Sequence, residues 1–135
     1  MGLFKTLVLY FSTLAVCFGI DLVWLSLMNS RFYKPHLAGL MSDKVNWLPA
    51  ILFYVLFIVG MLVLVVFPAV DKGSWVRAIL TGGLLGMVAY ATYDLSNLAT
   101  LKDWPAILTV VDIAWGTALS AAVASASYFI AWVLA

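Results

Sequence analysis

Hydrophobic residues dominate four long stretches of the chain, and polar residues gather in the short segments between them. The apolar stretches cover about residues 3–28, 47–70, 75–99 and 104–134. Each exceeds the roughly 20 residues that a helix needs to cross the hydrocarbon core of a bilayer. None shows the alternation typical of a membrane barrel strand, and only helices and closed barrels satisfy their own backbone polar groups in lipid. The pattern predicts four transmembrane helices.

The predicted fold is therefore all-α, a four-helix transmembrane bundle that forms a single integral membrane domain over residues 1–135. Hairpin connections are expected near 71–74 and 100–103, whereas the connection at 29–46 is longer. Apolar residues recur in it at helical spacing, so part of it is expected to lie in the interface as an amphipathic turn. These residues are Tyr33, Leu37, Leu40 and Met41.

Tryptophans mark three of the predicted helix starts. Trp47, Trp75 and Trp104 each open an apolar stretch, and indole rings favour the membrane interface. The charges do not settle the orientation. With the terminal amino group included, four positive charges fall on each side of the membrane, so the positive-inside rule does not select a direction.

Composition narrows the classes of function. The chain is 66% hydrophobic and 10% charged, with a mean hydropathy of +1.13, whereas soluble domains carry about 25% charged residues. Cys17 and His36 are the only residues of their types, which excludes disulfide scaffolds and Cys/His zinc sites. The net charge of +1 is dispersed, so no nucleic-acid partner is expected. We predict no cofactor and no metal centre, and membrane lipids as the immediate partners.

Three acidic residues inside the apolar stretches carry the strongest functional signal. Asp21, Asp94 and Asp112 would each cost about 2.5 to 3.5 kcal/mol as an ionised group at the centre of a helix. At 1.5 Å per residue, each lies roughly 7 to 10 Å from the middle of its helix. All three are displaced toward the side that carries the 29–46 and 100–103 connections. We therefore expect them to converge on one polar pocket.

Neighbouring residues on the same helical faces complete the predicted site. Gly82 and Gly86 share a face with Asp94, and Gly116 shares one with Asp112, so these faces are expected to pack closely inside the bundle. The 47–70 helix is expected to form a wall. A structural interpretation stays open, because an intramembrane Asp can also hold helices together through hydrogen bonds. The predicted ligand-binding residues are Asp21, Trp24, Tyr90, Tyr93, Asp94, Asn97, Asp112 and Trp115.

Several segments are similar to one known family. Asp-Leu-Val-Trp-Leu at 21–25, Trp-Leu-Pro-Ala at 47–50, the segment at 90–102 and Asp-Ile-Ala-Trp-Gly-Thr at 112–117 carry the likeness. Together they resemble small bacterial membrane proteins grouped as domain-of-unknown-function family 2177. The resemblance implies a multi-pass protein of the bacterial inner membrane with four helices. It implies no activity and no ligand.

Three hypotheses about function follow from these residues. The first is that the bundle binds or moves a small hydrophobic, cationic or lipid-like molecule in a pocket lined by acidic and aromatic side chains. The second is a proton-coupled exporter that works as a homodimer, although the chain lacks the Glu that small multidrug transporters use. The third is a magnesium-dependent enzyme acting on lipids, with Asp21, Asp94, Asn97 and Asp112 as oxygen ligands. Enzymatic activity is the less favoured of these interpretations.

Overall fold

The computed structural model describes residues 1–135 and contains only helices and their connections. The helical elements in chain order are α1 (Leu3–Met28), η1 (Asn29–Tyr33), α2 (Lys34–His36), α3 (Trp47–Met61), η2 (Leu62–Val66), α4 (Phe67–Asp71), α5 (Trp75–Thr100) and α6 (Ala106–Leu134). The elements η1 and η2 are short π-helical segments.

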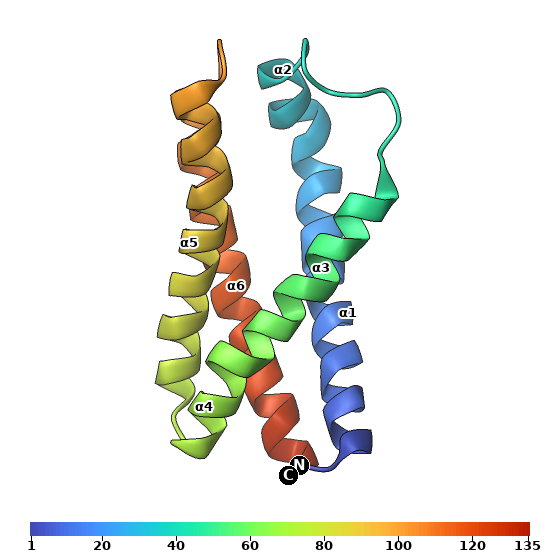
Figure 1. Cartoon of the computed structure of the whole chain (residues 1–135), viewed down its shortest axis with the longest axis vertical. Coiled ribbons are helices and arrows are strands. Elements are labelled where there is room, and N and C mark those ends of the chain that lie inside the picture. The colour runs from blue at the N-terminus through green and yellow to red at the C-terminus, as the bar shows by residue number, and fades with distance from the viewer.

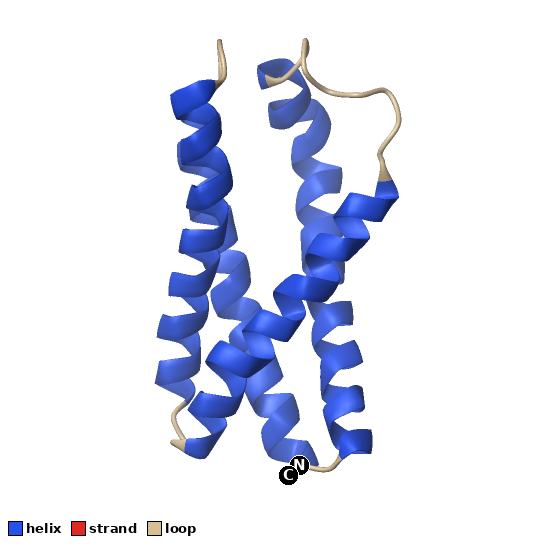
Figure 2. Ribbon diagram, viewed as in Figure 1, coloured by secondary structure: helices blue, strands red, loops and turns tan.

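These elements join into four continuous helices that are long and apolar enough to cross a membrane. The helices are Leu3–His36, Trp47–Asp71, Trp75–Thr100 and Ala106–Leu134. They run side by side and alternate in direction, so both chain termini lie at the end that also holds the α4–α5 turn (Figures 1 and 2). The prediction of an all-α bundle with four spanning helices is confirmed.

Both π-helical segments lie directly before a proline. The first ends at Tyr33, two residues before Pro35, and the second ends at Val66, two residues before Pro68. Proline lacks an N–H group and its ring collides with the carbonyl four residues earlier in a regular α-helix. A wider π turn removes that conflict and lets the helix continue. Each chain segment therefore passes through its proline without ending.

This continuation corrects one sequence-based expectation. The first membrane helix does not give way to a loop at residue 29; its path extends to His36, and the connection is confined to residues 37–46. Tyr33 consequently lies on a helix and points into the bundle rather than along the interface. The last helix starts at Ala106, two residues after the predicted start. Trp104 precedes it and is buried, with 8% of its surface exposed, so it is not a lipid-facing anchor.

Small residues bring α5 and α6 into close contact. A Cβ atom on Gly86 would collide with the side chain of Ser120 and the carbonyl oxygen of Gly116. A Cβ atom on Gly116 would in turn collide with the ring of Tyr90. Backbones can approach this closely in lipid only where side chains are absent or small. The predicted packing of the glycine-bearing faces is therefore present.

The helix formed by α3, η2 and α4 crosses the bundle diagonally (Figure 1). Its first part packs against α1, whereas η2 and α4 pack against α5 and α6. The apolar core accordingly gathers where η2 meets the other helices, around Met61, Val66, Val123 and Ala124. Toward the other end, α3 diverges from α5, and the three membrane acids occupy that half of the bundle.

Candidate functional site

Asp21 on α1 is held by two hydrogen bonds from neighbouring helices. The hydroxyl of Tyr54 on α3 donates to Oδ2, and Nε1 of Trp115 on α6 donates to Oδ1 at 3.1 Å. The residue is 7% exposed. Because one donor comes from α3 and the other from α6, this single carboxyl group ties three helices together.

Asp112 on α6 is the acceptor at the end of a short chain of polar side chains. The hydroxyl of Tyr33 donates to its Oδ1 at 2.7 Å, and Nε1 of Trp24 donates to the Tyr33 oxygen at 2.9 Å. The ring of Trp24 also stacks on Trp115, with centroids 4.2 Å apart and planes 6° from parallel. The two indole rings thus link the hydrogen bonds of Asp112 to those of Asp21.

Asp94 on α5 stands apart because it is fully buried and has no donor. Its exposed fraction is 0%, and neither carboxyl oxygen accepts a hydrogen bond from a surrounding N–H or O–H group. The polar group that it faces is the carboxyl of Asp112. A carboxyl group can donate a hydrogen bond only when it is protonated, so two ionised carboxylates here would only repel each other.

The acids and aromatic side chains enclose a cavity of about 170 Å³ between α1, α5 and α6. It is lined by Asp21, Trp24, Leu25, Tyr33, Leu37, Tyr90, Tyr93, Trp104, Leu108, Asp112 and Trp115. Six of the eight residues predicted from sequence are among them. Asp94 lies behind Asp112, outside the lining, and Asn97 lies beside Tyr93 without reaching the cavity. The structure therefore brings most of the predicted site together.

A second cavity adjoins the first where α3 diverges from α5. It has a volume of about 300 Å³ and is lined by Phe53, Ala89, Tyr90, Tyr93 and Asp112. The last three residues also line the first cavity. Phe53 and Tyr93 are exposed at 45% and 58%, so this space reaches the outer surface of the bundle between α3 and α5. An apolar chamber thus lies between the acidic cavity and the outer surface of the bundle.

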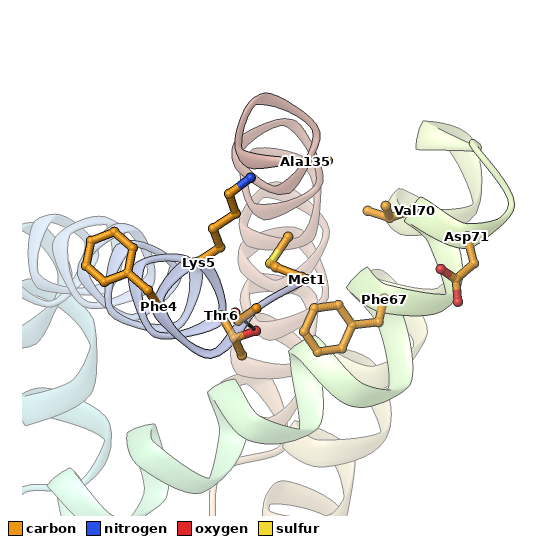
Figure 3. Close-up of a pocket in the computed structure, with 9 residues that line it drawn as sticks. Met1, Phe4, Lys5, Thr6, Phe67, Val70, Asp71 and Ala135 are labelled. Carbon is orange, nitrogen blue, oxygen red and sulfur yellow. Dashed lines mark hydrogen bonds between the residues drawn. The ribbon is translucent and has the colours of Figure 1, made fainter.

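A larger cavity, about 850 Å³, lies at the opposite end of the bundle beside the chain termini. Its lining includes Phe4, Lys5, Phe67, Asp71 and the terminal Ala135, which surround an opening between the ends of the helices (Figure 3). It contains none of the three membrane acids. Its polar side chains, Lys5, Thr6 and Asp71, form no hydrogen bond or ion pair with one another. We therefore place the candidate site at the acids.

Comparison with known proteins agrees with the fold. The sequence model of a family described as a predicted membrane protein, DUF2177, matches residues 6–129. The chain belongs to this family. No curated protein and no solved structure matches the chain. Membership of DUF2177 confirms the resemblance found in the sequence and supports a membrane protein, while the chemistry of the site has to be argued from its own residues.

Three aromatic hydrogen-bond donors at the site were not among the residues predicted to bind a ligand. Tyr33 and Tyr54 supply the hydroxyl donors to Asp112 and Asp21, and Trp104 covers the cavity with its indole N–H directed at Thr109. Tyr33 was assigned to the interfacial turn, and Tyr54 was placed only in an apolar wall. The available signal was that a carboxyl group inside a membrane needs a partner, and tyrosine is one of the donors that these helices offer.

The positions of the acids give the magnesium hypothesis no support. No group of three or more His, Cys, Asp or Glu side chains is arranged so that it could hold one metal ion. Two oxygens of Asp21 are already occupied by Trp115 and Tyr54. What the arrangement offers instead is a set of hydrogen-bond acceptors at the inner end of an apolar and aromatic chamber.

Proposed function

We propose that this DUF2177 protein binds a small amphiphilic, lipid-like molecule inside the membrane. The polar end of the ligand would occupy the cavity lined by Asp21 and Asp112, and its apolar body would lie in the adjoining chamber at Phe53 and Ala89. The observation that carries the proposal is that the two cavities lie side by side and share Tyr90, Tyr93 and Asp112.

The shape and chemistry of these cavities support an amphiphile more than a wholly polar ligand. The inner cavity combines two carboxyl groups with aromatic walls, whereas the outer chamber offers a single polar residue among four apolar or aromatic ones. Ligand sites in proteins are mostly apolar, with a few convergent polar groups that fix orientation. A molecule with one polar end and one alkyl chain satisfies both parts.

The chain contains a reporter for testing this binding. Cys17 is the only cysteine, it is free, and it is 1% exposed. A thiol-reactive fluorogenic maleimide therefore labels it when the bundle unfolds. A ligand that binds only the folded state raises the unfolding temperature, so dodecylamine, dodecanol and dodecanoate can be compared as probes in phosphatidylcholine nanodiscs.

A cavity-filling variant separates binding at this site from general effects of the probes. Ala89→Phe places a ring in the outer chamber and should abolish most of the shift in unfolding temperature. Ala99→Phe makes the same change at an exposed position of the same helix and should leave the shift unchanged. If none of the three probes stabilises the unmodified protein, or if both variants respond alike, the proposed function is wrong.

A further inference from the structure

The geometry points to a cationic ligand: we infer that the cavity selects amphiphiles whose polar end is a protonated amine, with Asp94 and Asp112 as the groups that attract it. The inference rests on the proposed function and specifies its ligand class. It starts from Asp94, whose carboxyl group is fully buried and receives no hydrogen bond.

The free acceptors of the site match the donors of an ammonium group. Asp112, which belongs to the cavity lining, accepts a hydrogen bond only at Oδ1, which leaves Oδ2 available to a ligand. The oxygens of Asp94 also lack a donor, but this buried residue lies outside the lining and can act on a ligand only through its charge. A primary ammonium carries three N–H donors and no acceptor. Asp21 differs, because Trp115 and Tyr54 already donate to both of its oxygens. The unfilled acceptors are thus concentrated at the Asp94–Asp112 pair.

No positive charge of the protein compensates this pair. The hydrogen bonds to the membrane acids come from tyrosine and tryptophan alone, and none comes from Lys, Arg or His. Buried carboxylates are stable only when they are paired or neutralised. Two solutions exist here: a proton shared between Asp94 and Asp112, or a cation brought by the ligand. The aromatic lining of the cavity beside Asp112 favours the cation, since ring faces also attract ammonium groups.

The position of Asp94 behind Asp112 fits this role. Asp112 lines both cavities, so an ammonium group would meet it first, and the charge of Asp94 would add to the negative potential at that point. A carboxylate end would be repelled by the same potential. An alcohol can donate one hydrogen bond but brings no charge. The expected order of affinity is therefore dodecylamine, then dodecanol, then dodecanoate.

The test compares the three probes on the unmodified chain in phosphatidylcholine nanodiscs at neutral pH, with Cys17 labelling as the readout. Partitioning of each probe into protein-free nanodiscs is measured in parallel, so that affinities refer to the concentration in the lipid. Dodecylamine should bind at least about tenfold more tightly than dodecanol, because a hydrogen bond to a charged group contributes about 1.5 kcal/mol or more.

Charge-removing variants locate the preference. Asp94→Asn and Asp112→Asn should each reduce the advantage of dodecylamine over dodecanol, while Asp43→Asn, at an exposed position of the 37–46 connection, should keep it. The comparison on the unmodified chain decides the matter even if one variant fails to fold. Equal binding of dodecylamine and dodecanol would overturn this inference in favour of the shared proton and leave the proposed function intact. Absence of binding by all three probes would overturn the proposed function itself.

Discussion

Replacing Gly86 by alanine should loosen the contact between α5 and α6 and destabilise the bundle. The added Cβ atom would overlap the side chain of Ser120 and the carbonyl oxygen of Gly116. The carbonyl oxygen of Gly116 belongs to the backbone, and the short side chain of Ser120 is attached directly to the backbone. Neither can move aside as the end of a long, flexible side chain could. The two helices must therefore separate, or one of them must rotate.

The expected magnitude follows from two opposing effects. Alanine favours a helix over glycine by roughly 0.5 to 1 kcal/mol, whereas overpacking a tight contact costs about 1 to 3 kcal/mol. We expect Gly86→Ala to lower the free energy of unfolding by about 1 to 2 kcal/mol. Gly19 and Gly60 are matched controls, because a Cβ atom there would meet nothing within 4 Å. Gly19→Ala and Gly60→Ala should be neutral or slightly stabilising.

These differences in the free energy of unfolding can be measured in mixed micelles of dodecylmaltoside with an increasing fraction of dodecyl sulfate. Labelling of Cys17 reports the unfolded fraction of each variant. The reasoning requires Gly86→Ala to fall below both controls. If Gly86→Ala proves as stable as Gly19→Ala, the close packing of α5 on α6 described above is incorrect.

Three further measurements address the rest of the fold. Tags at both termini and in the turn at 72–74 should report the same compartment, because four crossings return the chain to its starting side; a population in both orientations would instead favour a dimeric exporter. Tyr54→Phe removes a donor to Asp21 and should cost about 1 kcal/mol of unfolding free energy in the same micelle titration, and an unchanged value would contradict that hydrogen bond. The buried hydroxyls of Thr13 and Ser127 lie 2.7 Å apart. In a double-mutant cycle, the changes in unfolding free energy caused by Thr13→Val and Ser127→Ala should therefore depart from additivity by about 0.6 kcal/mol. Strictly additive changes would rule out the coupling of the two hydroxyls.

The sequence predicted those features that depend on local pattern and on depth in the membrane. Long apolar stretches predicted the four helices, and the spacing of Asp21, Asp94 and Asp112 along their helices placed all three at the same level and in one pocket. In the structure, Asp21 and Asp112 line one cavity, whereas Asp94 lies outside its lining. Helical periodicity also identified Gly86 and Gly116 as contact positions, because the same face carries the acids and the small residues.

Features that depend on contacts between distant segments were beyond such reasoning. Polar residues after Met28 suggested that the first helix ends there, yet a π turn carries it through Pro35 and delivers Tyr33 to Asp112, 79 positions away in the chain. Trp104 looked like an interfacial anchor because tryptophans often are, but it lines the cavity together with Asp21 and Trp24 of the first membrane helix. Tertiary partners decide both outcomes, and no local pattern encodes them.

The divergence of α3 from α5 determines which concentration a ligand of this protein would respond to. The outer chamber lies between two membrane-spanning helices, where Phe53 and Tyr93 are exposed on the outer surface of the bundle. Occupancy would then follow the mole fraction of the ligand in one leaflet, and the total amount of lipid in a sample would dilute the ligand as a solvent does.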